Sequence, residues 1–326
     1  MDCLLEIKNL TIAYRTGGGH STTAVDGVSL NLSKGESLGL VGESGSGKST
    51  IGAAVMGLLP RNAEIVSGEI LFNGEDLLRT DAETLRQLRW KQLSMIFQAA
   101  MNALNPIQRV GDQIVEAIRV HEPETGPTQA LGRVETLFHQ MGIPLERLRH
   151  FPHQYSGGMR QRAIIAMALA CNPQLIIADE PTTALDVIVQ DQILKTILAL
   201  QKELSLAILF ISHDIAVIAD VCHHVGVMYA GQIVEIGSSE EVFATPGHPY
   251  TQALLGAHIT LSDDGKAPRA IMDNSNDTEE VDIGCRFAPR CLSVKAECHK
   301  TAPQWLKRSE THWIRCPMAP AKNSEA

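Results

Sequence analysis

The strongest chemical signal in the sequence is a glycine-rich stretch between residues 42 and 49. It reads Gly-Glu-Ser-Gly-Ser-Gly-Lys-Ser, which fits the phosphate-binding pattern G-x-x-x-x-G-K-[ST]. Glycines let the backbone turn so that successive N–H groups point at an anion. Lys48 is expected to reach the β- and γ-phosphates, and the Ser49 hydroxyl to bind Mg²⁺. The loop glycines and the further loop residues expected at the nucleotide are Gly42, Gly45, Gly47, Ser44 and Thr50.

The neighbouring residues decide against a simple Gly/Ser-rich turn. An apolar run, Leu38 to Val41, precedes the loop, and a helical run, 49–59, follows it until Pro60. This is the order of strand, loop and helix that a phosphate-binding loop requires. The helix would add the positive end of its dipole to the site.

Two carboxylates follow a second apolar run further along the chain. Residues 175–178 are Leu-Ile-Ile-Ala, and Asp179 and Glu180 come directly after them. Such runs are typical of buried parallel strands, whose carboxyl ends carry the ligand sites of α/β proteins. An Asp in this place can hold Mg²⁺, and an adjacent acid can deprotonate an attacking water. An exposed acid pair is the alternative, and Lys48 and Ser49 upstream disfavour it.

Other polar residues sit at the ends of predicted strands. His213 follows the apolar run 207–211 and is a candidate partner of the γ-phosphate, although a helix-capping cluster is the alternative. Tyr14 ends the alternating run 5–14, where its ring could stack on adenine or simply belong to the core. Ser156, Gly157 and Gly158 precede a helical run and form a second possible anion site, which lacks a lysine.

The rest of the pattern predicts the elements that position these residues. Residues 28–32 and 36–41, joined by the Lys34-Gly35 turn, predict a hairpin leading into the loop. Residues 225–229 and 232–236 predict a second, closing hairpin. Helical patterns between about 99 and 172 predict a helical subdomain inserted between strands.

Composition limits the class of protein. The 326 residues are 44% hydrophobic, enough for a sizeable core, and a net charge of −9 argues against a general nucleic-acid binder. The N-terminus lacks the basic start and apolar core of a signal peptide, and the longest apolar run, residues 163–171, is too short to span a membrane. These features predict a soluble cytosolic protein that could dock on a membrane protein.

Taken together, the ordered motifs resemble those of the ATP-binding-cassette (ABC) ATPases. The resemblance rests on 42–49, Gln98, 156–158, 175–180, 184–186 and His213, and it covers residues 4 to about 258. It implies an α/β nucleotide-binding domain with an antiparallel β subdomain and a helical insertion. It also implies a head-to-tail dimer that holds two ATP molecules between the 42–49 loop of one subunit and the 156–158 signature of the other. A P-loop kinase or GTPase would explain neither the signature nor His213.

The resemblance also implies a role for each matched residue. Tyr14 would stack on adenine, Glu180 would be the general base, and Asp186 would lie in the segment that communicates across the dimer. The implied catalytic residues are Lys48, Gln98, Glu180 and His213, and the implied Mg²⁺ ligands are Ser49, Gln98 and Asp179.

Four segments point to the dipeptide/oligopeptide importer branch of this family: Asn105-Pro106, 156–162 (Ser-Gly-Gly-Met-Arg-Gln-Arg), 178–186 and 248–255. The implied partners are a second, related ABC ATPase, two membrane permeases and an extracytoplasmic solute-binding protein, with no nucleic acid. The implied location is the cytoplasmic face of the inner membrane. A soluble ABC ATPase of DNA repair or translation is the alternative, which the single cassette and the absence of heptad repeats disfavour.

Four of the seven cysteines lie close together near the C-terminus. Cys285, Cys291, Cys298 and Cys316 are spaced C-x₅-C-x₆-C-x₁₇-C, which in a reducing compartment predicts a metal or cluster site. The gaps are wider than those of common zinc knuckles, and they resemble the C-terminal extension of dipeptide/oligopeptide ATPases, which can hold a [4Fe–4S] cluster. Zn²⁺ is the alternative. The expected domains are an ATPase domain at 1–258, a polar linker at 259–283 and a cysteine-rich region at 284–326.

Overall fold

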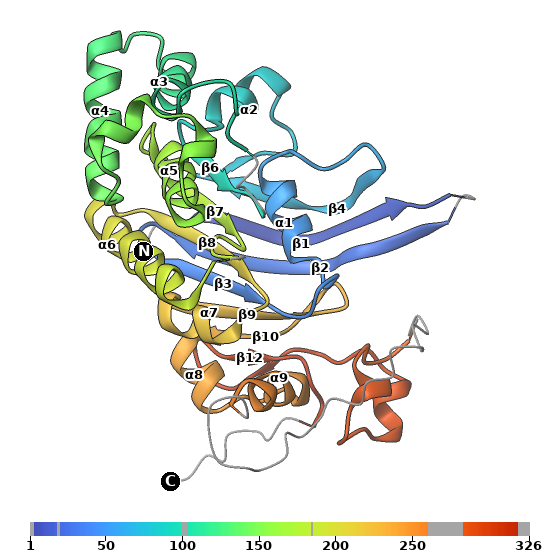
Figure 1. Ribbon diagram of the computed structural model, residues 1–326. Coiled ribbons are helices and arrows are strands. Elements are labelled where there is room, and N and C mark those ends of the chain that lie inside the picture. The colour runs from blue at the N-terminus through green and yellow to red at the C-terminus, as the bar shows by residue number, and fades with distance from the viewer. Residues whose placement is uncertain (1–2, 18–19, 99–102, 184, 260–282, 319–326) are drawn as a thin grey trace.

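One sheet runs through the middle of the molecule (Figure 1). It contains the strand that precedes the phosphate-binding loop and two short strands of the C-terminal region. The computed structural model describes residues 3–17, 20–98, 103–183, 185–259 and 283–318. The strand order of this sheet is β11-β12-β10-β9-β3-β8-β7-β6. Its strands are β3 (Ser37–Val41), β6 (Leu93–Ile96), β7 (Leu175–Asp179), β8 (Ala207–Ser212), β9 (His224–Tyr229), β10 (Gln232–Ser238), β11 (Leu306–Lys307) and β12 (Trp313–Ile314).

The parallel part of this sheet brings the predicted site residues to one edge. β9, β3, β8, β7 and β6 are successive parallel neighbours, so their carboxyl ends point the same way. In the register, Val41 lies opposite Ser212, and Asp179 lies opposite Ile211. The residues that follow these strand ends therefore meet at the edge where α/β proteins bind ligands.

Both faces of the parallel strands are covered. Ile176 and Phe210 belong to the core under the helical subdomain, whereas Ile177 and Leu209 belong to the core under the second sheet. Neighbouring side chains on a strand point to opposite faces, so a strand buried on both faces is apolar at most positions. This confirms the reading of 175–178 and 207–211 as buried parallel strands.

The second sheet is antiparallel, with the order β2-β1-β4-β5. Its strands are β1 (Cys3–Arg15), β2 (Ser21–Ser33), β4 (Ala63–Phe72) and β5 (Glu75–Asp76). The predicted hairpin of 28–32 with 36–41 is wrong, because β2 pairs with β1 while β3 lies in the other sheet. The burial pattern explains this: β3 is buried at all five positions, as a central parallel strand is, whereas β2 alternates. The closing hairpin β9–β10 is confirmed.

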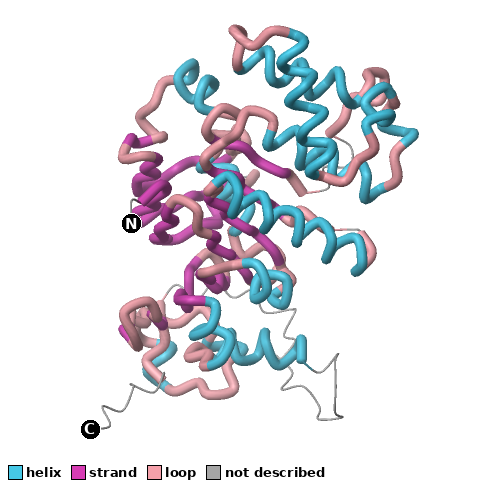
Figure 2. The backbone as a smooth tube through the Cα atoms, turned by 90° about the vertical axis from the view of Figure 1, so that its left-hand side faces the viewer, coloured by secondary structure: helices cyan, strands magenta, loops and turns pink. Residues whose placement is uncertain are grey.

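Helices pack on the sheets and form a subdomain at the top of Figure 1, which Figure 2 shows from the side. The helices are α1 (Lys48–Val55), α2 (Ala82–Leu88), α3 (Val110–His121), α4 (Pro127–Gln140), α5 (Gly157–Leu169), α6 (Val187–Leu204), α7 (Ile215–Val221), α8 (Ser239–Ala244) and α9 (Pro249–Ile259). α3, α4 and α5 share one core with the sheet. The helical insertion is therefore confirmed, and it is packed on the sheet.

The C-terminal region lies at the other end of the molecule, below β10 in Figure 1. Its strand β12 pairs with β10, so it extends the main sheet. The region therefore shares the sheet and the core with the ATPase domain. Residues 260–282 of the predicted linker lie outside the described residues, as do residues 319–326.

Candidate active site

The phosphate-binding loop has a backbone that requires glycine. Gly42 (φ 152°) and Gly47 (φ 99°) lie in conformations that favour this residue. A Cβ atom would come within 2.1 Å of the Met228 carbonyl oxygen at Gly42, and within 2.3 Å of the Ala24 carbonyl oxygen at Gly47. Gly47 also caps α1, with no side chain bonded to the first N–H groups of the helix. These groups are therefore available to a phosphate, and Ser44, Gly45 and Ser49 are exposed beside them.

Lys48 is folded back over the loop. Its side chain is buried, and Nζ donates to the Gly42 carbonyl oxygen at 2.7 Å, the Glu43 carbonyl oxygen at 2.8 Å and Ser46 Oγ at 3.1 Å. Burial lowers the pKa of Lys48, and the nearby acids Glu180, Asp179 and Glu43 oppose the shift. The lysine thus occupies the loop with its charge turned to backbone oxygens, which phosphates can replace.

Two predicted Mg²⁺ ligands meet beside Lys48. The Ser49 hydroxyl donates to Asp179 Oδ1 at 3.0 Å, and Asp179 is 4% exposed. Burial raises the pKa of Asp179, and the hydrogen bond from Ser49 opposes it. Within the described residues, no group of three or more His, Cys, Asp and Glu side chains is placed to hold a metal ion. A hydroxyl and one carboxylate still fit Mg²⁺ at a nucleotide, because phosphates and waters supply its other oxygens.

Glu180 is held at the same edge by a ring of hydrogen bonds. Its carboxylate accepts from Gln98 Nε2 at 2.8 Å and from Thr183 Oγ1 at 3.0 Å, and Oε1 lies 2.8 Å from His213 Nδ1. Burial raises the pKa of Glu180, but the bonds to His213 and Thr183 outweigh it, so the pKa is lowered. The acid is therefore ionised near neutral pH, as a general base must be.

These contacts also show where the structure places the other predicted site residues. Gln98 and His213 both contact Glu180. Among the described residues, neither forms a hydrogen bond with Asp179 or Ser49, which bond to each other. Tyr14 ends β1 next to the loop, with its hydroxyl 3.2 Å from Thr50 Oγ1. Sequence reasoning missed Thr183, although its place three residues after Glu180 could have indicated it.

The signature lies on a different part of the chain from the loop. Ser156 caps α5 by accepting from the Met159 N–H at 3.3 Å, and it is exposed. A Cβ on Gly158 would lie 2.7 Å from Val189 Cγ1, so this glycine allows α5 and α6 to pack closely. Asp186 caps α6 by accepting from the Val189 N–H at 2.9 Å. Ala184 lies outside the described residues. In the described part of the chain, no hydrogen bond joins residues 156–158 to the 42–49 loop.

The four C-terminal cysteines do not form an assembled metal site in the structure. Cys285, Cys298 and Cys316 are buried, and Cys291 is partly exposed. Burial raises the pKa of Cys285, Cys298 and Cys291 raise it further, and backbone N–H groups at Phe287 and Ala288 oppose the shift. The Cys285 N–H donates to the Cys298 carbonyl oxygen at 2.7 Å, so the backbones of these two residues are adjacent. In residues 283–318 they are not placed as a group that could hold a metal ion. The predicted iron–sulfur centre is therefore not supported by the geometry.

Comparisons with known proteins agree with the site. Residues 25–183 match the family model described as ABC transporter. The fold is similar to the dimeric structure of MJ0796, a bacterial ABC transporter cassette, with a TM-score of 0.65 and 27% identity, covering 72% of this chain and 99% of that one. Fold and site together define an ATPase of the ABC class.

Two relatives and a second family model narrow the class. Over 319 residues the chain is 43% identical to the dipeptide transport ATP-binding protein DppD of Bacillus subtilis (strain 168), covering 97% of this chain and 95% of that protein. Over 316 residues it is 45% identical to the oligopeptide transport ATP-binding protein OppD of the same organism, covering 96% and 88%. Residues 234–298 match the model described as oligopeptide/dipeptide transporter, C-terminal region. The chain belongs to the oligopeptide/dipeptide family of ABC-transporter ATP-binding proteins. These relatives do not favour the alternative in DNA repair or translation.

None of the helices in the described residues has the length and hydropathy that crossing a membrane requires.

Proposed function

We propose that this chain hydrolyses ATP to power the import of peptides or related small solutes through an ABC transporter. The observation that carries the proposal is the meeting of Lys48, the Ser49–Asp179 pair and ionised Glu180 at one sheet edge. The peptide class is supported by the names of the relatives and by the C-terminal family match.

In the proposed mechanism, the 42–49 loop binds the phosphates through its N–H groups, and Lys48 exchanges its backbone partners for them. Ser49 and Asp179, with Gln98, would hold Mg²⁺, which would supply positive charge to neutralise the phosphates. Glu180 takes the proton of the attacking water. His213, which contacts Glu180, would keep this acid oriented and bind the γ-phosphate. Tyr14 would stack its ring on adenine.

A second ATPase subunit completes each site in this proposal. The 156–158 signature, separated from its own loop, would bind the ATP of the partner in a head-to-tail dimer. The exposed apolar side chains Val187 and Ile188, directly after Asp186, support a contact surface here. A related but different ATPase, two permeases and an extracytoplasmic solute-binding protein complete the proposed transporter, with this chain on the cytoplasmic face of the inner membrane. Residues 99–102, where a permease would dock after Gln98, lie outside the described residues.

Replacement of the proposed base tests the chemistry. Glu180→Gln keeps the shape of the side chain but cannot take a proton, so the assembled transporter should bind ATP and lose turnover by about a thousandfold. Glu240→Gln, at an exposed position on α8, is the matched control. Turnover that persists in Glu180→Gln above that of a Lys48→Ala preparation would contradict the assignment.

We also propose that Cys285, Cys291, Cys298 and Cys316 hold a [4Fe–4S] cluster, with Zn²⁺ as the alternative. Support comes from their chemistry, since thiolates ligate iron–sulfur clusters, from the burial of Cys285, Cys298 and Cys316, and from the backbone hydrogen bond that joins Cys285 to Cys298. Protein purified without oxygen should contain iron and acid-labile sulfide, and Cys285→Ser should lose both while ATP binding stays. Cys3→Ser, which removes an exposed thiol at the opposite end of the sequence, is the control. Zinc without sulfide, or full iron retention in Cys285→Ser, would contradict the cluster.

A further inference from the structure

Two arginines of the C-terminal region contact the ATPase domain beside the phosphate-binding loop. The Arg290 guanidinium donates to Glu43 twice, from NH1 to Oε2 at 2.8 Å and from NH2 to Oε1 at 2.9 Å. Arg286 donates to Asp26 Oδ2 at 2.6 Å and to the Ala230 carbonyl oxygen. A paired, parallel arrangement such as that of Arg290 is both stronger and more specific in direction than a single contact.

Glu43 is the second residue of the phosphate-binding loop, and it is the one acidic side chain between Gly42 and Ser49. Its carbonyl oxygen accepts from Lys48 Nζ at 2.8 Å, and its N–H donates to the Tyr250 hydroxyl at 3.0 Å. The same residue is thus joined to the phosphate-binding lysine through its backbone and to Arg290 of the C-terminal region through its side chain.

The aromatic residues around Arg290 hold its guanidinium in place. Its central carbon lies 5.7 Å from the centre of the Tyr229 ring, within the range of a cation–π contact. The Tyr229 ring packs edge-on against Tyr250 and Phe287, with centroids 4.8 Å and 5.2 Å apart. Phe287 is 2% exposed. Arg290 therefore presents a fixed positive charge to Glu43.

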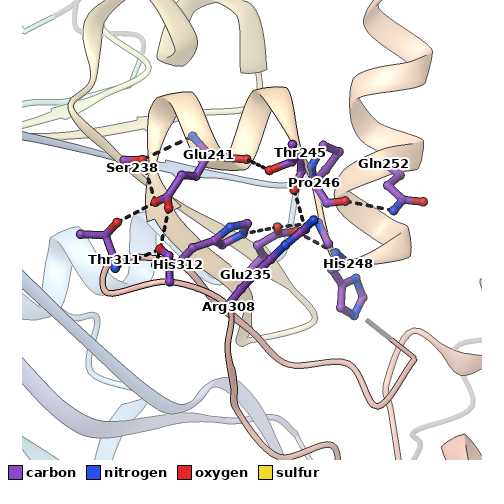
Figure 3. Close-up of polar contacts among 12 residues, drawn as sticks. Glu235, Ser238, Glu241, Thr245, Pro246, His248, Gln252, Arg308, Thr311 and His312 are labelled. Atoms are coloured by element: carbon purple, nitrogen blue, oxygen red, sulfur yellow. Dashed lines mark hydrogen bonds and ion pairs between the residues drawn. The ribbon is translucent and has the colours of Figure 1, made fainter. Parts of the chain in front are cut away.

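The C-terminal region is also docked by contacts that do not involve Arg290 (Figure 3). His312 Nε2 lies 2.7 Å from Glu235 Oε1, and both side chains are buried. Thr311 Oγ1 donates to Glu241 Oε2 at 2.6 Å, and Arg308 donates to the Thr245 carbonyl oxygen at 2.8 Å. We therefore expect the C-terminal region to stay docked when Arg290 is replaced. A change in ATP affinity can then be assigned to the loop and not to misfolding of the region.

The electrostatics give this ion pair a consequence for ATP. A carboxylate within a phosphate-binding loop repels the triphosphate, and the Glu43 side chain is 38% exposed, so solvent screens only part of this repulsion. We propose that Arg290 is a positioning residue for ATP, which raises the ATP affinity of the loop by holding and neutralising Glu43. The C-terminal region thereby acts on the nucleotide site although Arg290 lies outside the 42–49 loop. The inference rests on ATP binding by the 42–49 loop.

The test compares ATP binding and turnover among full-length variants. Arg290→Ala should raise the Kd for a fluorescent ATP analogue, and the KM for ATP in the assembled transporter, by roughly three- to tenfold. The value of kcat should change little, because Arg290 contacts no reacting group. Glu43→Gln combined with Arg290→Ala should restore the affinity, since the unpaired charge is gone. Arg308→Ala is the matched control, because it removes an arginine of the same region whose contact is the Thr245 carbonyl oxygen and not a loop residue.

Three outcomes would overturn the inference. ATP affinity in Arg290→Ala could equal that of the parent chain, it could fall equally in Arg308→Ala, or it could stay low in the double variant. An equal fall in Arg308→Ala would assign the effect to docking of the C-terminal region. A low affinity in the double variant would assign it to tethering of the loop by Arg290. Failure of the parent chain itself to bind ATP would instead refute the proposed function.

Discussion

Two regions of the molecule are proposed to contact ATP: the α5–α6 side with Ser156, and the phosphate-binding loop beside the C-terminal region. They differ in whether this chain alone completes them. On the α5–α6 side, the signature serine Ser156 is exposed, and Val187 and Ile188 are 81% and 72% exposed. On the side of the C-terminal region, Arg290 and Tyr250 contact Glu43 within the loop itself. Apolar side chains left in solvent favour a partner, whereas paired charges and packed rings need none. The difference supports the proposal that one side is completed within the chain and that a second subunit would complete the other.

The largest expected effect comes from a substitution on the α5–α6 side, which is proposed to need a second subunit. Ser156→Arg removes the cap of α5 and puts a long cation where the ATP of the partner would bind, so turnover of the assembled transporter should fall by about a hundredfold. ATP binding by the single chain should not change. Ser293→Arg, at an exposed serine of the C-terminal region, is the control. Normal turnover in Ser156→Arg would show that the α5–α6 side takes no part in catalysis.

A smaller effect is expected when a contact that docks the C-terminal region on the ATPase domain is removed. His312→Ala leaves Glu235 without its buried side-chain partner, although the carboxylate keeps the N–H groups of Gly247 and His248. We expect a loss of about 2–3 kcal/mol in the free energy of unfolding, measured with urea. His299→Ala removes an exposed histidine of the same region and should cost little. Equal stability of the two variants would contradict the docking role of His312.

The smallest effect concerns pH at the same docking surface. Burial raises the pKa of Glu241, but hydrogen bonds from Ser309, Thr311 and Ser238 prevail and lower it to about 2, from 4.5. A lowered pKa in the folded state stabilises the fold above pH 4.5, and this stabilisation is lost as pH falls toward 2. The difference in urea midpoint between the parent chain and Glu241→Gln should therefore shrink from pH 6 to pH 3. A difference that stays constant with pH would contradict the assignment.

Local patterns predicted the ATP side of the molecule well. The strand, loop and helix around Lys48 and the buried strands before Glu180 and His213 are confirmed, because each pattern reports on its own stretch of chain. Their parallel order then places the strand ends together, which is why separate motifs predicted one site. The chemical roles of these residues stay predictions until tested.

Long-range pairings explain what the sequence did not predict. The Lys34-Gly35 turn looked like a hairpin turn, yet β2 and β3 pair in different sheets, since pairing depends on which faces become buried. β12 is two residues long and pairs with a strand about 80 residues earlier, too little pattern to recognise. The Arg290–Glu43 pair joins residues 247 positions apart, and neither residue type indicates the other. The spacing of the cysteines predicted proximity but not their geometry.

Recovery of the intact complex tests most directly the claim that a second subunit completes the site. Tagged Glu180→Gln chain, which should retain bound ATP, would be purified from its native membranes in mild detergent with ATP and Mg²⁺, and its partners identified by mass spectrometry. We predict two multi-span permeases and a second ABC ATPase, with the second ATPase held more weakly when Ser156→Arg is added. Recovery of the chain with ribosomal or DNA-repair proteins, and with neither permease nor second ATPase, would contradict the account.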